Sequence, residues 1–142
     1  MAERTLSLAS CTAVSGKPTM VMEGKPLEIY GEKNFRTSLC YISDTVDGIL
    51  KLMNTDRDPG PVNLGSDDDL LLADVAKKII ELTGSASKVV FKPALLFMSA
   101  LPLPNIQKAK DELAWFPVRR LQDGLKEMIE YTRARKHLLG VK

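Results

Sequence analysis

Residues 25–54 carry the clearest pattern of apolar and polar positions in the chain. Residues 26–31 (PLEIYG) alternate apolar and polar side chains before a glycine, which predicts a half-buried strand. After a polar turn, residues 38–42 (SLCYI) favour a second strand. Ser43 and Asp44 can then cap a helix. Its apolar residues fall on one face at helical spacing: Val46, Ile49, Leu50 and Met53.

The next segments predict a helix followed by a strand. Three consecutive carboxylates at residues 67–69 are expected to cap the helix and to complement its dipole. Gly84 is expected to end this helix as a left-handed cap, and residues 87–93 (SKVVFKP) form the next predicted strand. The predicted buried stripe of the helix comprises Leu72, Val75, Ala76, Ile79 and Ile80.

Two further helices are predicted after residue 104. In the first, Ala109 and Leu113 reach the core and Trp115 closes the segment. The apolar face of the second comprises Leu121, Leu125, Met128, Ile129 and Thr132. With a short strand expected at residues 62–64, the pattern predicts an α/β or α+β fold, with at least three helices over a few short strands.

Composition narrows the function class. A chain of 142 residues, 44% hydrophobic and 27% charged, fits one globular domain. Its net charge of +2 comes from 20 basic and 18 acidic side chains, so no nucleic-acid-binding face is expected. Two cysteines and one histidine make a metal site unexpected. We find no membrane-length apolar run and no signal peptide, and expect a cytoplasmic protein.

Several segments, in this order, resemble motifs of the extended short-chain dehydrogenase/reductase family. These are the NAD-dependent nucleotide-sugar epimerases, dehydratases and decarboxylases, and the UDP-glucuronate decarboxylase (UDP-xylose synthase) branch is the most similar. The resemblance implies a carboxy-terminal substrate-binding subdomain without the Rossmann half. Residues 1–23 match nothing in the family, so we divide the chain into a divergent segment, 1–23, and a nucleotide-sugar-binding-like domain, 24–142. The matching segments are 26–31, 37–44, 46–53, 60–65, 91–93, 104–115 and the stretch from 124.

The resemblance implies positions for nucleotide binding. In the family a strand offers its backbone to the uracil ring, and the matching residues here are Leu27, Glu28, Ile29 and Tyr30. The family arginine that pairs with the diphosphate corresponds to Thr37, whereas this chain has Arg36 one place earlier. Side chains of successive strand residues face opposite ways, so Arg36 should point away from the phosphate unless a bulge restores the register. Asn63 matches a nucleotide-site asparagine, or it merely ends a short strand.

The catalytic and cofactor motifs of the family are missing from this sequence. No strand–GxGxxG–helix unit occurs, and no tyrosine is followed four residues later by lysine. The full-length family uses NAD, but we expect neither a cofactor site nor catalytic residues in this chain.

The strongest departure from the family follows residue 93. The decarboxylase branch has a charged stretch there, whereas this chain has ALLFMSALPLPNI. These residues either pack into the chain's own core or cover a partner, which would be a second copy or a separate Rossmann-domain chain. The expected contacts are Leu95, Leu96, Phe97, Met98 and Leu101.

Three functional hypotheses therefore stay open. The first is a UDP-sugar-binding carboxy-terminal fragment that is not catalytic alone. The second is a homo-oligomeric interaction module that has lost its ligand. The third is one half of a split enzyme that a Rossmann chain completes.

Overall fold

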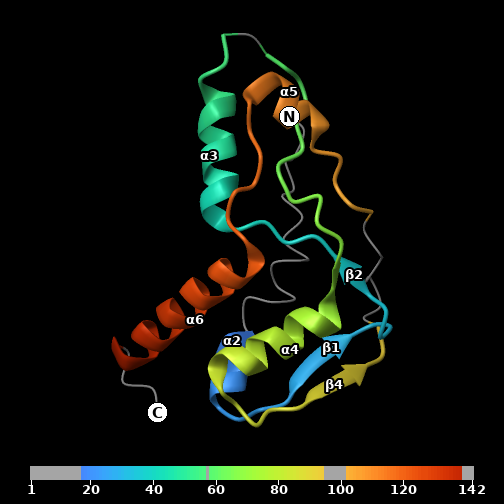
Figure 1. The fold of residues 1–142 in the computed structure, drawn as a ribbon, viewed down its shortest axis with the longest axis vertical. Helices are drawn as coiled ribbons and strands as arrows, with labels where there is room; N and C mark the ends of the chain where they lie inside the picture. The colour runs from blue at the N-terminus through green and yellow to red at the C-terminus, as the bar shows by residue number, and fades with distance from the viewer. Residues whose placement is uncertain (1–16, 57, 95–101, 139–142) are drawn as a thin grey trace.

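A computed structural model describes residues 17–56, 58–94 and 102–138 (Figure 1). Helices and short strands are mixed, which confirms the predicted fold class. The elements in chain order are α2 (Lys17–Met22), β1 (Leu27–Tyr30), β2 (Arg36–Thr37), α3 (Ile42–Met53), β3 (Leu70–Leu71), α4 (Leu72–Thr83), β4 (Val89–Lys92), α5 (Gln107–Leu113) and α6 (Leu121–Leu138).

The strands form two small sheets. Strands β1 and β4 are parallel, with Leu27 opposite Val89 and Tyr30 opposite Lys92. Strands β2 and β3 are antiparallel, with Arg36 opposite Leu71. The predicted strand at 26–31 is therefore confirmed, because β1 lies within it and alternates buried and half-buried residues as the sequence does.

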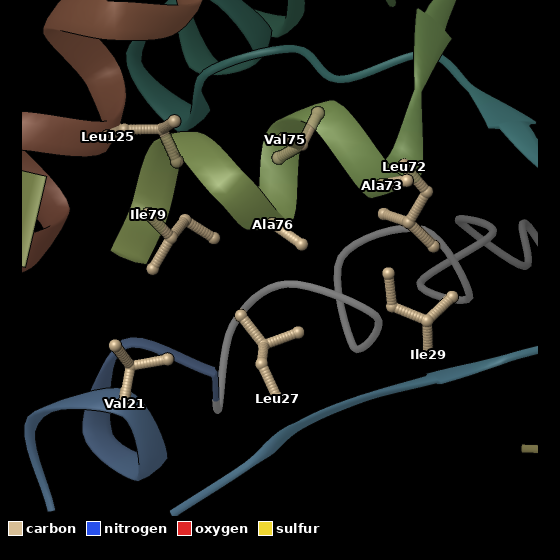
Figure 2. Close-up of a cluster of buried hydrophobic side chains, with 9 residues drawn as sticks. All are labelled: Val21, Leu27, Ile29, Leu72, Ala73, Val75, Ala76, Ile79 and Leu125. Atoms are coloured by element: carbon tan, nitrogen blue, oxygen red, sulfur yellow. The ribbon is translucent and has the colours of Figure 1, made fainter. Parts of the chain in front are cut away.

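The larger core lies between α4 and β1. Figure 2 shows Ala76 and Ile79 of α4 above Leu27 of β1, with Val21 of α2 and Leu125 of α6 at its margin. The predicted stripe of α4 is confirmed, since four of its five members are buried and Ile80 is half-buried. The left-handed cap at Gly84 is confirmed too, with a φ of 65°.

Helix α2 shows that the core reaches into the segment left unmatched by the family. Val21 is fully buried, and α2 contacts both α4 and α6. The division of the chain at residue 23 stays a prediction.

A second, smaller core forms around Trp115. Its buried members are Ala109, Leu113 and Trp115, as predicted, and Val62 and Leu64 pack against them. The indole Nε1 of Trp115 donates a hydrogen bond of 2.8 Å to the backbone oxygen of Asp44. Figure 1 shows α3 and α5 side by side at this end of the molecule, away from the pair β1–β4.

The predicted capping role of Ser43 and Asp44 is wrong. Helix α3 begins at Ile42, two residues before the start that a Ser43 cap would give, and no side chain caps it. Asp44 lies inside the first turn and is only 5% exposed. Its Oδ2 accepts hydrogen bonds from the backbone N–H groups of Val118 (3.1 Å) and Arg119 (2.9 Å). The carboxylate therefore fixes the segment that leads to α6.

The predicted capping by residues 67–69 is wrong as well. Residues 70 and 71 first form strand β3, so α4 begins only at Leu72 and the carboxylates lie ahead of its first turn. Asp67 instead pairs with Lys110 at 2.7 Å, and this hydrogen bond holds the pKa of Asp67 below its usual value. Asp69 pairs with Arg36 at 2.6 Å. Both carboxylates thus join segments that are distant in sequence.

Two predicted strands are absent from the structure. In the stretch predicted as a strand at 38–42, residues 38–41 are irregular and residue 42 already belongs to α3. Residues 62–64 form no strand, because side-chain packing against Trp115 holds them instead. The other predicted elements are confirmed: β4, α5 and α6, with Leu125 and Ile129 buried.

We predict that Asp44→Ala destabilises the protein by about 1–3 kcal/mol, because two backbone N–H groups lose their acceptor in a half-buried place. Asp47→Ala is the matched control on the same helix, where an exposed ion pair with Lys51 is worth about 0.5 kcal/mol. Urea unfolding followed by circular dichroism measures both. Equal losses in the two variants would contradict the assigned role of Asp44.

Candidate functional site

Strand β1 holds four of the predicted nucleotide-binding residues. The side chains of Leu27 and Ile29 are buried under α4, so only their backbone can meet a ligand. The Tyr30 hydroxyl donates to Glu28 Oε2 at 3.0 Å, and Lys92 Nζ lies 3.6 Å from Glu28 Oε1. Hydrogen bonding to the Glu28 carboxylate raises the pKa of Tyr30, which keeps this phenol protonated at neutral pH.

The hydrogen bonds of β1 show which of its backbone groups face β4. The amides of Leu27 and Gly31 donate to the carbonyl oxygens of Lys88 (2.9 Å) and Lys92 (3.0 Å). In a parallel ladder alternate residues direct their backbone groups to opposite sides. The backbone groups of residues 28 and 30 therefore face away from β4.

The guanidinium of Arg36 is engaged within the chain. Nε donates to Asp69 Oδ2 at 2.6 Å and Nη2 donates to the Asp69 backbone oxygen at 2.8 Å. The hydrogen bond that Arg36 donates to the Asp69 carboxylate is the main reason that the pKa of Arg36 is raised. Both donors are therefore committed to Asp69, in the forked geometry that an arginine would otherwise offer to a phosphate.

The register of β2 keeps Arg36 and Thr37 on opposite faces. Arg36 lies opposite Leu71 and Thr37 opposite Leu70, so no extra residue interrupts the pairing between them. Thr37 is half-buried, and its hydroxyl lies 3.5 Å from the backbone oxygen of Ser38. The position that corresponds to the family arginine thus carries a short, uncharged side chain.

Asn63 lies in the part of the molecule built around Trp115. Its Nδ2 donates to the backbone oxygen of Asn105 at 3.1 Å, which ties residues 62–64 to the start of α5. Val62 and Leu64 belong to the smaller core, whereas Leu27 and Ile29 belong to the larger one. The predicted site residues are therefore spread over β1, the β2–β3 pair and the approach to α5.

Two surface hollows are lined by other residues. The larger, of about 350 Å³, is lined by Asn54, Thr55, Asp56, Pro59, Glu112 and Leu113. Its two carboxylates would repel a diphosphate. The smaller, of about 110 Å³, lies between Leu39, Ser66, Asp68 and residues 117–121.

The smaller hollow contains two arginines that sequence reasoning missed. Arg119 lies 3.4 Å from Glu127 and over the ring of Tyr41, and Arg120 lies 2.8 Å from Asp123. Only their adjacency in sequence after a proline could have marked them. Because carboxylates already pair with both, we assign them a structural role.

Other chemistries find little support in the part of the chain that the structure describes. Within residues 17–56, 58–94 and 102–138, no group of three or more His, Cys, Asp or Glu side chains could hold a metal ion. No helix in the same ranges has the length and apolar character that crossing a membrane requires. Burial raises the pKa of the Cys40 thiol, so little nucleophilic thiolate forms at neutral pH.

Comparison with known proteins shows which proteins the chain is similar to. It is 34% identical over 118 residues to UDP-glucuronic acid decarboxylase 1 of Danio rerio, a match that covers 83% of this chain and 28% of the relative. The structure also superposes on UDP-glucose 4-epimerase of Thermotoga maritima, solved with UDP-glucose, with a TM-score of 0.77 and 26% identity. The chain is therefore similar in sequence to a UDP-glucuronic acid decarboxylase and in fold to a UDP-glucose 4-epimerase. The predicted resemblance is thus confirmed.

The chain spans only part of the length of these relatives. It spans 28% of the zebrafish relative, and the match to the Thermotoga enzyme covers 83% of this chain and 38% of that one. UDP-glucuronic acid 4-epimerase of Bacillus cereus, solved with UDP-glucuronic acid and NAD, shares the fold at 21% identity and a TM-score of 0.77, over 84% of this chain and 38% of that one. No protein-family model matches the chain. The partial coverage fits the carboxy-terminal part predicted from the sequence.

The contact segment predicted at Leu95, Leu96, Phe97, Met98 and Leu101 lies outside the described residues. Whether it serves self-association or a Rossmann-domain partner stays a prediction.

We predict that Cys40 reacts slowly with iodoacetamide at pH 7.5, at least about tenfold more slowly than free glutathione, because burial disfavours its thiolate. The rate should rise with pH beyond the value at which a free thiol has already ionised. The measurement uses a Cys11→Ser variant and mass spectrometry of the alkylated protein. A rate equal to that of glutathione would make Cys40 a candidate nucleophile after all.

Proposed function

We propose that this chain binds the nucleotide part of a UDP-sugar and that it does not catalyse a reaction alone. The observation that carries the proposal is β1, which forms where the family motif predicts it. Its apolar side chains face the core, and the backbone groups of residues 28 and 30 face away from β4. In the family that the sequence resembles, the backbone of this strand contacts the uracil ring, and we propose the same role for it here.

Backbone recognition explains how binding can survive divergence of sequence. A ligand that meets only N–H and C=O groups is indifferent to the side chains at those positions, provided that the strand itself forms. Burial of Leu27 and Ile29 under α4 supplies that condition. The relatives from Thermotoga maritima and Bacillus cereus were solved with UDP-glucose and with UDP-glucuronic acid, which supports a UDP-sugar as the ligand class.

The affinity of the isolated chain for UDP should be low. Arg36 is committed to Asp69, and Thr37 stands at the position that corresponds to the family arginine. A hydrogen bond to a charged group is worth about 1.5–3 kcal/mol, roughly ten- to hundredfold in affinity. The chain thus keeps the element proposed for the base and lacks the one expected for the diphosphate.

The chain alone lacks the groups that the chemistry of the family needs. Hydride chemistry needs a bound nicotinamide and an acid/base residue within reach of the sugar. The sequence has neither the glycine-rich turn nor the tyrosine–lysine pair, and the raised pKa of Tyr30 leaves little phenolate to act as a base at neutral pH. The relative from Bacillus cereus was solved with NAD, which we assign to the part of the fold that this chain does not span.

We predict that the purified chain shows no turnover of UDP-glucuronic acid or UDP-glucose in the presence of NAD. Chromatography of the nucleotide sugars after overnight incubation measures this, with an intact decarboxylase in the same buffer as the positive control. Conversion at a rate proportional to the concentration of the chain would refute the proposed lack of activity.

We predict that UDP binds more tightly once arginine stands at residue 37. The double substitution Arg36→Thr, Thr37→Arg moves the guanidinium to the opposite face of β2 and should lower the Kd for UDP about tenfold or more. Titration calorimetry compares the double variant with wild type.

Arg36→Thr alone is the matched control, and its Kd should stay within about twofold of wild type, because this arginine is engaged by Asp69. A large loss of affinity in this control would show that Arg36 binds the phosphate directly. Absence of UDP binding in all three proteins would remove the nucleotide from the proposal.

A further inference from the structure

Helix α3 exposes a row of apolar side chains at the spacing of a helix–helix seam. Ten large apolar side chains are exposed among the described residues, and half of them lie on this helix. They are Ile42 (67% exposed), Val46, Ile49, Leu50 (52%) and Met53 (75%), and we call them the α3 stripe. Four of them recur at intervals of four, three and four residues, which is the repeat at which a second helix can interdigitate its own side chains. The α3 stripe is therefore a candidate surface for another helix.

The packing of α3 within the chain keeps this row outside. A Cβ on Gly48 would lie 3.0 Å from Nε1 of Trp115 and under 3 Å from the side chain of Leu64, so the inner side of the helix approaches the smaller core at a glycine. Asp44, also on the inner side, is 5% exposed and accepts hydrogen bonds from the backbone of residues 118 and 119. Turning the helix to bury the α3 stripe would break these contacts and expose the Asp44 carboxylate. The α3 stripe is thus left for a partner to cover.

The composition and extent of the α3 stripe fit a second copy of this chain. All five side chains are aliphatic or methionine and none is charged, and homodimer interfaces are more apolar than the rest of a protein surface. At these exposures each side chain leaves roughly 100 Å² open, so two stripes in contact would bury about 1,000 Å², the least that a specific interface needs. Figure 1 shows α3 at the margin of the described fold, where a second copy can approach. A second copy also supplies a helix of identical repeat and length, and twofold dimers are the commonest oligomers.

A polar border beside the α3 stripe sets the direction of pairing. Asp47 and Lys51 lie along this border one turn apart, with 3.3 Å between Lys51 Nζ and Asp47 Oδ2. A twofold axis between antiparallel helices brings the same border of both copies together in reverse order. Asp47 of one copy then lies beside Lys51 of the other, so the charges complement each other. A parallel pair would instead place this border against the opposite one, where Thr45 and Leu52 carry no charge.

We propose that this chain forms a twofold dimer in which α3 packs antiparallel against α3 of a second copy. The α3 stripes of the two copies bury each other, and Asp47 and Lys51 form ion pairs across the interface. The dimer thereby covers the apolar face that the packing around Trp115 leaves outside. It does not depend on the nucleotide proposed for β1, because β1 belongs to the other core.

The first experiment measures the mass of the full 142-residue chain by sedimentation equilibrium. We expect wild type to be a dimer. In the variant Val46→Lys, Leu50→Lys the Kd of the dimer should rise at least about a hundredfold, because like charges then meet in the seam. Gln122→Lys, at an exposed position on α6, is the control for added charge and should dimerise like wild type. Circular dichroism of each monomer should show the same helix content in all three proteins.

Three results would overturn the proposal. Wild type could stay monomeric at the highest concentration at which it is soluble. Val46→Lys, Leu50→Lys could unfold while Gln122→Lys does not, which would mean that the chain's own residues cover the α3 stripe. The third result concerns the contact segment predicted from the sequence: if Leu96→Asp, Phe97→Asp dissociates the dimer and the lysine variant of α3 does not, the interface lies elsewhere.

The second experiment tests the antiparallel direction by changing the charges of the border. Asp47→Lys leaves two lysines there and Lys51→Asp leaves two aspartates, so each variant alone should dimerise at least about tenfold more weakly than wild type. An equimolar mixture, with one variant fluorescently labelled, should form a heterodimer whose Kd lies within about threefold of the wild-type value. Such restoration also shows that both variants fold, although Lys51→Asp loses the hydrogen bond to the backbone oxygen of Ala114. A mixture that associates no more tightly than either variant alone refutes the proposed dimer.

Discussion

The contact between Trp115 and the first turns of α3 fixes the arrangement of this molecule. The indole donates to the backbone of Asp44, lies against Gly48 and is fully buried, while the Asp44 carboxylate holds the two residues that precede α6 by two and three positions. One side chain and one carboxylate thereby join α3, α5 and the approach to α6. An unpaired buried carboxylate would be costly, so the hydrogen bonds and the helix orientation require each other.

The two hydrophobic cores hold different parts of the domain in place. The larger one, between α4 and β1, holds β1 in place through the burial of Leu27 and Ile29, together with the pairing of β1 with β4. The smaller one, around Trp115, sets the direction of α3 and therefore of its outer face. Between them lie surface ion pairs such as Arg36–Asp69 and Lys110–Asp67, which join distant segments but add little to stability because solvent screens them. The apolar cores therefore supply most of the stability of the fold, and the ion pairs connect segments that are distant in sequence.

Periodicity predicted the elements whose burial follows the helix or strand repeat. The stripe of α4, the alternation of β1 and the left-handed residue Gly84 were all readable from local sequence. Contacts between distant residues were not readable, and they caused the errors: Asp44 and Asp67 stand where caps often stand, yet their partners lie 74 and 43 residues away. Residues 62–64 failed as a strand for a similar reason, since packing against Trp115 replaced strand pairing. The register of Arg36 and Thr37 was predictable, because alternation is a property of any strand, but the engagement of Arg36 by Asp69 was not.

Helix α3 also shows what a local hydrophobic pattern cannot predict. Its pattern predicts an amphipathic helix, and the structure contains one, yet the apolar side points outward because a glycine, an aspartate and a tryptophan occupy the inner side. A hydrophobic pattern states that a face will be covered; it does not state by which chain. In a domain that evolved alone the covered face and the inner face coincide. Here they are opposite faces of one helix, because Asp44 and Gly48 face Trp115 while the large apolar side chains face solvent.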